Sequence, residues 1–519
     1  MQQVNNNILI KFTIIASLLL FLPSLSKGEI QYSHSGYANV STVNRLSDGS
    51  IIKMPYRVLS YEPVISYNNF NIVANTALEF RLKDISKIMD SDLKVDLREL
   101  YIEWMTPLGD FSLGKQIITW GSASENNPTD NISPYNYYYL FSLGKERKEG
   151  IFSLNSTLYW NNLKLNTVLI PQHNTNVLPL NDPEFAISIP INPRDEQILV
   201  INEPFEYGLS ITMPIQSIDI TTSYFSGYDR IMSFFGVNFW TESDGDPQNG
   251  LIDTVLSYRK TDNYGLGVST LLGDFSLNID YGYFISKDNI DRTVDGLISS
   301  SDAYTTPSGY STLLENINSH IYRDLGAHYI IDECERMNKF CEQSPNPNCY
   351  VNPNCGDEPL LFEQFILDNR AKYYQFTIEV QYAPNSDFNI ISQYTNYDLI
   401  SIGNPDTLFN TQDGPTALYP DSLFIPGMGS PNTFISSNAI SISARKLFPD
   451  MGLELSYTSM FDLDEKGSLH GVGLEYELFS NTKLLIEVTK IFDNEEIPMN
   501  PFTGMKDFSR ILFELKYFY

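Results

Sequence analysis

Hydrophobic and polar residues alternate along many short stretches of the chain, which is typical of β-strands with one apolar and one polar face. From residue 29 onward, about twenty segments of roughly 9 to 13 residues follow this period of two. In 274–286, for example, Phe275, Leu277 and Ile279 share one face, and the residues between them are polar. The pattern predicts a chain built almost wholly of strands.

The segment 510–519 repeats the alternation and ends on an aromatic residue. Phe513, Leu515 and Tyr517 fall on one face, whereas Glu514 and Lys516 fall on the other. This resembles the closing strand of bacterial outer-membrane β-barrels, in which the terminal aromatic residue is the signal for the β-barrel assembly machinery. The alternative is an amphipathic edge strand of a soluble sandwich.

Residues 1–28 are expected to be a secretory signal peptide. Lys11 supplies the positive charge, 12–22 is the apolar core, and small residues follow it. That core is too short for a spanning helix, and no later stretch offers about 20 consecutive apolar residues. If the chain enters a membrane, it therefore does so as strands.

Connection lengths favour a barrel over a sandwich, because short and long connections alternate along the chain. The short ones are predicted at 107–110, 161–162, 214–217, 272–274, 383–387, 448–452 and 479–482. The long ones are predicted at 121–149, 175–203, 287–370 and 399–433. We expect an all-β fold in which 29–519 form a transmembrane antiparallel β-barrel of about 18 to 20 strands, with 16 as an alternative. Its short turns would be periplasmic and its long loops extracellular.

The strand count depends on one segment. A barrel of about twenty strands requires 231–241 to be a barrel strand. Without that strand and one neighbour, the count falls to about eighteen, because a closed barrel of this type needs an even number.

Composition and charge narrow the class further. The chain has 33 tyrosines and 31 phenylalanines but only 4 tryptophans and 12 methionines, a mixture that favours strands. Its formal net charge of −29 argues against nucleic acid as a partner.

All four cysteines lie within the predicted large extracellular loop, 287–370. They are Cys334, Cys341, Cys349 and Cys355. An exported chain passes through an oxidising compartment, so two local disulfides are the favoured interpretation. Zinc is a minor alternative, since the spacing lacks a pair of cysteines separated by two residues.

The segment 97–139 resembles bacterial outer-membrane porin-like barrels, including uncharacterised families near the alginate-export porins. The matching residues are Leu97, Arg98, Glu99, Tyr101, Gly114, Gln116, Trp120, Gly121, Asn127, Pro128, Asp130 and Pro134. The sequence departs from the family pattern at Lys115, Tyr135 and Asn136. The resemblance implies a barrel channel and leaves its solute open.

Around this segment the alternation predicts which side chains face the lumen. Glu99, Tyr101 and Glu103 point inward, whereas Lys115 shares a face with apolar residues. A charge on the lipid face at mid-bilayer costs about 2 to 4 kcal/mol, so we expect a bulge that turns Lys115 inward or a shifted strand. The loop 121–149 either folds into the lumen or points outward on its own turns.

The predicted pore lining is mainly acidic. Its candidates are Glu99, Tyr101, Glu103, Lys115, Gln116, Glu125, Asp130, Asp280, Glu379, Glu454, Glu475 and Glu477. We expect a porin-like channel for small hydrophilic solutes with a weak preference for cations. A surface binding or adhesion protein anchored by a barrel is the alternative, and a transporter of hydrophobic substrates is less favoured.

No motif for catalysis, a cofactor or a metal stands out in the sequence. Its five histidines are scattered, and neither a His-Glu-x-x-His nor a Gly-x-Ser-x-Gly pattern occurs. We therefore expect a protein without enzymatic activity or cofactor. The expected partners are outer-membrane lipid, the assembly machinery and small solutes, and the oligomeric state is open.

Overall fold

The structure is a computed structural model that describes residues 29–82, 91–140, 144–180, 182, 184, 198, 201, 203–241, 251–287, 360–366, 370–402, 424–494 and 501–519. The predicted signal peptide, 1–28, and all four cysteines lie outside these residues. None of the helices in the described ranges is long and apolar enough to span a membrane.

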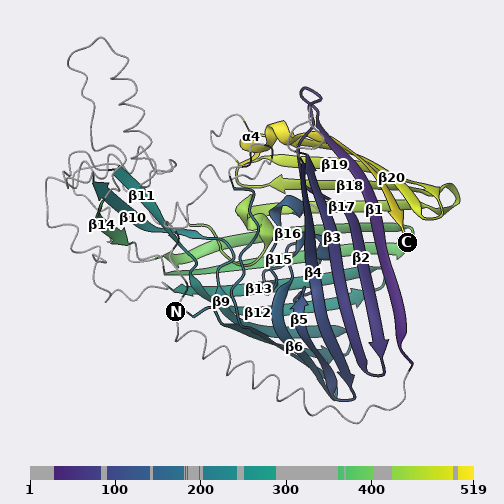
Figure 1. The fold of residues 1–519 in the computed structure, drawn as a ribbon, viewed down its shortest axis with the longest axis horizontal. Coiled ribbons are helices and arrows are strands. Elements are labelled where there is room, and N and C mark those ends of the chain that lie inside the picture. The colour runs from purple at the N-terminus through teal and green to yellow at the C-terminus, as the bar shows by residue number, and fades with distance from the viewer. Residues whose placement is uncertain are drawn as a thin grey trace.

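Eighteen antiparallel strands form one closed barrel (Figure 1). In chain order they are β1 (Gln31–Arg45), β2 (Tyr56–Tyr67), β3 (Phe70–Leu82), β4 (Ser91–Thr106), β5 (Gly109–Gln116), β6 (Ile151–Trp160), β7 (Leu163–Ile170), β8 (Glu206–Ile215), β9 (Ile218–Tyr228), β12 (Lys260–Leu272), β13 (Phe275–Lys287), β15 (Ala371–Asn385), β16 (Phe388–Ile402), β17 (Asn438–Phe448), β18 (Leu453–Asp462), β19 (Ser468–Phe479), β20 (Thr482–Phe492) and β21 (Arg510–Phe518). Each strand pairs with the next, and β21 pairs with β1 from Arg45↔Arg510 to Tyr37↔Phe518. The closure leaves no free edge, which a hydrocarbon environment requires.

The segment 231–241 does not enter the barrel. It contains a strand, β10 (Ser233–Thr241), which pairs with β11 (Leu251–Ser257) and β14 (Leu360–Ile366) in a separate three-stranded sheet beside the barrel (Figure 1). Strand β9 pairs directly with β12 along its whole length, so no place remains between them for another strand. The described barrel therefore has 18 strands, and neither the 20-strand nor the 16-strand alternative is found.

Short connections gather at one end of the barrel, called here the short-turn end. They lie at 68–69, 107–108, 161–162, 216–217, 273–274, 386–387, 449–452 and 480–481. Left-handed residues make several of these turns tight, among them Asn161 with φ 52° and Gly273 with φ 65°. The longer connections lie at the opposite end, the long-loop end, and carry the short helices η1 (Tyr137–Tyr139), η2 (Gly144–Arg147), η7 (Pro431–Phe434), α4 (Pro501–Met505) and η9 (Lys506–Phe508). The turn between β17 and β18 contains η8 (Pro449–Met451).

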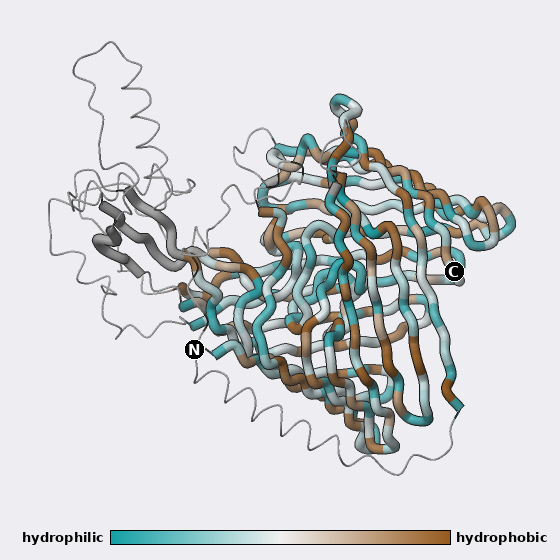
Figure 2. Tube along the Cα trace, viewed as in Figure 1, coloured by the Kyte–Doolittle hydropathy of each residue, from teal (hydrophilic) through white to brown (hydrophobic). Residues whose placement is uncertain are grey.

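The outer face of the wall is apolar. Hydrophobic and polar residues alternate along the strands (Figure 2), and Leu100 and Ile102 on the outer face are 47% and 49% exposed. Aromatic rings form rows across neighbouring strands, as where the centroids of Trp104 and Phe111 lie 5.7 Å apart. A closed barrel with this surface meets lipid on all sides. The protein therefore has the outer surface of a transmembrane β-barrel.

The last strand has the two faces that its sequence predicts. Phe513, Leu515 and Tyr517 are exposed on the outer face. Glu514 lies on the inner face, where it accepts a hydrogen bond from Asn39 Nδ2 of β1 at 3.0 Å. Where β21 pairs with β1, polar side chains therefore bond on the inner face and apolar side chains cover the outer face.

Two hydrophobic clusters lie inside the long-loop end of the barrel. One packs Tyr137, Ile435 and Phe502 against inward residues of β17 to β20. The other packs Ile132 and Met428 against inward residues of β6 to β15. Segments between the strands thus fill much of this end.

Candidate functional site

A β-bulge in β4 sets the geometry of the pore wall. Asn75 pairs with Glu99 and Thr76 with Leu97, so Arg98 is the extra residue between them. Both Arg98 and Glu99 are buried on the inner side as a result. Sequence alternation alone does not reveal this bulge.

Lys115 does not point into the lumen, so the prediction that a bulge turns it inward is wrong. The bulge lies in β4 and not in β5, so the alternation of β5 is unbroken and Lys115 stays on the outer face with Leu113. Its Nζ donates to the carbonyl oxygen of Leu97, next to the bulge, at 2.5 Å. That carbonyl gives the outward ammonium a polar partner at the barrel wall.

The chain that leaves β5 folds into the lumen, which decides between the two predictions for this loop. We call 117–136 the crossing loop. Its first amide, Ile117 N, donates to Glu99 Oε1 at 2.9 Å. Farther along, Asn126 Nδ2 donates to Gln393 Oε1 of β16 at 3.1 Å. Eight strand positions around the barrel separate β16 from β5, so the loop crosses the lumen.

Two carboxylates on the far wall hold the crossing loop by its backbone. We call Asp280 of β13 and Glu379 of β15 the anchoring carboxylates. Asp280 accepts from Ser122 N at 3.0 Å and Ala123 N at 2.7 Å, and Glu379 accepts from Ser124 N at 2.8 Å. They are 0% and 1% exposed. Their hydrogen-bonding capacity is therefore directed to the loop and not to passing solutes.

A buried ion pair closes the base of the loop. Lys148 Nζ lies 2.7 Å from Asp130 Oδ2 and 4.4 Å from the centroid of the Tyr135 ring. Burial lowers the pKa of Lys148, and the Asp130 charge opposes this change. The other oxygen of Asp130, Oδ1, accepts from Trp120 N at 3.1 Å. The crossing loop is thus held at its first residue, at 122–124 and at Asp130.

Arg230 joins four segments at the long-loop end. Its guanidinium donates to Glu206 Oε2 at 2.8 Å, to the Ile132 carbonyl at 2.9 Å and to the Asn174 carbonyl at 2.9 Å. Its backbone N–H donates to the Gly427 carbonyl at 2.7 Å. Arg230 therefore connects β8, the connection after β7, the crossing loop and the 424–430 segment.

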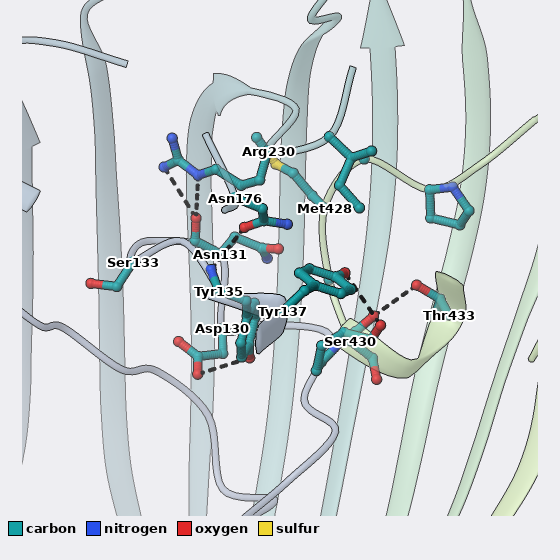
Figure 3. A pocket seen from close by; sticks show the side chains of 15 residues that line it. Asp130, Asn131, Ser133, Tyr135, Tyr137, Asn176, Arg230, Met428, Ser430 and Thr433 are labelled. Carbon is teal, nitrogen blue, oxygen red and sulfur yellow. Dashed lines mark hydrogen bonds between the residues drawn. The ribbon is translucent and has the colours of Figure 1, made fainter. Parts of the chain in front are cut away.

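Figure 3 shows where these segments meet around a cavity of about 20 Å³. Asn131 and Tyr137 reach it from the crossing loop and η1, and Ser430 reaches it from the segment before β17. Tyr137 Oη donates to the Pro431 carbonyl at 3.4 Å. The space admits about one water molecule, so the loops here are closely packed.

A much larger cavity, of about 360 Å³, lies between the crossing loop and the short-turn end. Glu99 and Glu103 of β4, called here the cavity carboxylates, lie on one wall with Tyr101. Lys164 of β7 lines it three strands farther around the barrel, two residues after a short turn. Trp120 closes the cavity from the side of the loop.

Contacts differ between the charged groups of this cavity. Glu99 is buried and lies 3.3 Å from Lys145 Nζ. Glu103 Oε2 accepts from Asn71 Nδ2 at 2.9 Å and has no basic partner among the described residues. Lys164 has no hydrogen-bond or ion-pair partner there either. Charges of both signs thus face the cavity.

The remaining predicted lining residues divide into two groups. Gln116 lines the cavity and donates to the Ser153 carbonyl at 3.0 Å. Glu454, Glu475 and Glu477 lie on β18 and β19, outside this cavity. Of these, Glu475 lies 2.5 Å from Lys483 Nζ.

Glu125 sits at the turn of the crossing loop. Arg147 Nη2 donates to its backbone carbonyl and to that of Ser124. Burial raises the pKa of the Glu125 carboxyl group, the charge of Arg147 opposes this, and the charge of Glu379 adds to it. This carboxylate therefore faces the anchoring side of the lumen.

Three side chains that hold the loops in place are not predicted from the sequence: Arg230, Glu206 and Gln375. Gln375 of β15 accepts from Ser430 N and donates to the Met428 carbonyl, both at 2.8 Å. The sequence pattern does not single out Arg230, because it predicts that the segment after Arg230 is a barrel strand. Its position two residues after the end of β9 is the available signal.

No group of three or more His, Cys, Asp or Glu residues in the described ranges could hold a metal ion. Neither a protein-family model nor a curated protein sequence matches the chain.

Several solved structures of outer-membrane proteins are similar in fold. Acinetobacter baumannii OccAB3 matches at 9% identity and a TM-score of 0.43, over 95% of this chain and 99% of that chain. Pseudomonas aeruginosa OccK5 (OpdH) matches at 8% and 0.42, over 95% and 98%. Vibrio cholerae OmpT matches at 9% and 0.36, over 96% and 100%. Similarity at these levels assigns neither a family nor a function.

Proposed function

We propose that this barrel is a narrow channel through which small hydrophilic solutes diffuse across the outer membrane. The observation that carries the proposal is the crossing loop, which the anchoring carboxylates hold across the lumen above a polar cavity. A wall of charged and hydrogen-bonding side chains suits water and solutes that are themselves hydrated. We take the short-turn end as periplasmic and the long-loop end as extracellular.

We infer a weak cation preference that arises from the cavity carboxylates. Asp130 is neutralised by Lys148, and the anchoring carboxylates are occupied by loop amides. Glu103 has no such partner, and Glu99 shares its charge with the exposed Lys145. One lysine, Lys164, opposes them. The field in the cavity is therefore acidic but modest.

A second candidate is a barrel that only anchors binding loops at the cell surface. The two hydrophobic clusters inside the long-loop end favour it, because packed side chains there leave little room for water. A transporter of hydrophobic substrates fits less well, since polar side chains predominate in the cavity.

Single-channel recording of purified protein in planar bilayers separates these candidates. The channel proposal expects discrete current steps, with a reversal potential in a KCl gradient that indicates mild cation preference. Deleting Ser122–Asn131 should increase the current and reduce the preference. A wild-type barrel without current would support the anchor, and an anion-selective current would contradict the charge argument.

A further inference from the structure

The wall of the 360 Å³ cavity formed by β6 to β9 carries neutral hydrogen-bonding groups. They are Asn155, Thr157, Asn166, Ser210, Thr212 and Thr221. Two pairs are already joined: Asn166 Nδ2 donates to Asn155 Oδ1 at 2.8 Å, and the hydroxyls of Thr212 and Thr221 lie 2.9 Å apart. These bonds fix the side chains, while hydroxyl and carbonyl oxygens keep lone pairs for a further partner.

Trp120 adds one rigid apolar surface to this polar cavity. Its indole Nε1 donates to Asn166 Oδ1 at 2.8 Å. Its ring packs on Gly208 of β8 so closely that an added Cβ there would lie 2.7 Å from Trp120 Cη2. The indole is therefore held from two sides. An aromatic plate among fixed polar groups suits a ligand with an apolar face and a hydroxylated rim.

The cavity carboxylates add acceptors and a negative charge on β4, two strands before this wall. A carboxylate offers two oxygens that accept from neighbouring hydroxyl groups or from an ammonium group. A ligand that carries its own carboxylate is repelled by Glu103 and must reach Lys164 to be compensated. The volume falls within the range of about 300 to 1,000 Å³ that small-molecule sites occupy.

We propose that this cavity is a subsite for neutral and amino-substituted sugars, which it favours over sugar acids of the same size. The inference rests on the proposed channel function and names its solute class. Glu103 discriminates by charge, Trp120 contacts the apolar face of the sugar ring, and the β6 to β9 wall bonds its hydroxyl groups.

Uptake by proteoliposomes tests this at low ionic strength, with radiolabelled glucose, glucosamine and glucuronate compared at equal concentration. Wild type should take up glucose and glucosamine faster than glucuronate. Glu103→Gln should lower the glucose-to-glucuronate ratio about 3-fold, the size expected for one carboxylate acting over several ångströms in a largely aqueous space. Lys164→Gln should change the ratio in the opposite direction.

Glu454→Gln is the matched control, because Glu454 is an acidic residue of the wall outside this cavity. Heat-modifiable migration of every variant shows that its barrel has assembled. Equal uptake of the three solutes, or the same ratio change in Glu103→Gln and Glu454→Gln, overturns the sugar inference and leaves the channel intact. Absence of uptake of all three solutes by wild type overturns the channel proposal as well.

Discussion

The anchoring carboxylates and the cavity carboxylates project from opposite walls of one lumen but have different surroundings. Asp280 and Glu379 are fully covered and accept from the amides of Ser122, Ala123 and Ser124. Glu103 faces a cavity and accepts one bond from an asparagine. The same chemical group thus organises the loop on one wall and meets solutes on the other.

The number of donors that surround each carboxylate explains the difference. A buried charge is costly unless hydrogen bonds replace its hydration. Glu379 has four donor contacts, from Ser124 N, Ser124 Oγ, Asn278 Nδ2 and Gln393 Nε2. Glu103 lacks such a shell and stays beside water. A full set of donors therefore marks the carboxylates that hold the crossing loop, and Glu103, which lacks such a set, is available for selectivity.

The largest effect is expected from removal of both anchoring carboxylates. In an Asp280→Ala, Glu379→Ala double variant, three loop amides lose their acceptors. Hydrogen bonds to charged groups contribute about 1.5 to 3 kcal/mol each, so the crossing loop should leave the far wall. Single-channel conductance should rise several-fold. A Glu103→Gln, Glu454→Gln variant controls for lost lumen charge, and an equal rise there would remove the distinction between the two sets.

The next effect concerns the ion pair at the base of the loop. Lys148 is 2% exposed, so Lys148→Met leaves the Asp130 charge buried without its partner. Breaking such a pair costs about 3 to 5 kcal/mol, which should appear as faster proteolysis within the crossing loop. The Asp130→Asn, Lys148→Met double variant should recover most of the resistance. If the double variant were as sensitive as the single one, the charge would not be the cause.

Glu99 combines features of the anchoring carboxylates and the cavity carboxylates, so a variant at this position tests the distinction between them. It lines the cavity, yet it also accepts from Ile117 N at the start of the crossing loop. A Glu99→Gln side chain can keep that bond but loses the pair with the exposed Lys145, worth about 0 to 1 kcal/mol. Conductance should stay near the wild-type value and cation preference should fall slightly. A large rise in conductance would instead place Glu99 among the anchors.

The sequence predicts the barrel well because alternation of side chains is a local property of each strand. Glu99, Glu103, Asp280 and Glu379 face inward as their positions in the alternation require. The hydrogen-bond partners of each carboxylate are not a local property. The donors to Asp280 are backbone amides about 160 residues away, and because every residue except proline has such an amide, the sequence does not mark these donors.

Two errors have the same origin. The bulge at Arg98 and the separate sheet of β10 depend on the partners of a strand, and the pattern within the strand does not specify them. Alternation in 231–241 predicts a strand correctly but not the sheet to which it belongs. Lys115 shares a face with apolar residues in the sequence, and in the structure its ammonium group donates to a backbone carbonyl of the neighbouring strand.

The smallest effect is expected at Glu125, a loop carboxylate held near the anchoring side. Burial raises its pKa in the docked loop, so docking favours the protonated form. Its contribution is favourable below the ordinary pKa of a glutamate and is lost as the pH rises through the raised value. At neutral pH the charged group opposes docking, and Glu125→Gln removes this opposition. Single-channel records should show fewer brief increases of current in Glu125→Gln than in wild type at about pH 7, and a smaller difference at about pH 4. More frequent increases in the variant at neutral pH would mean that the Glu125 charge stabilises the docked loop, and Glu125 would then belong with the anchoring carboxylates.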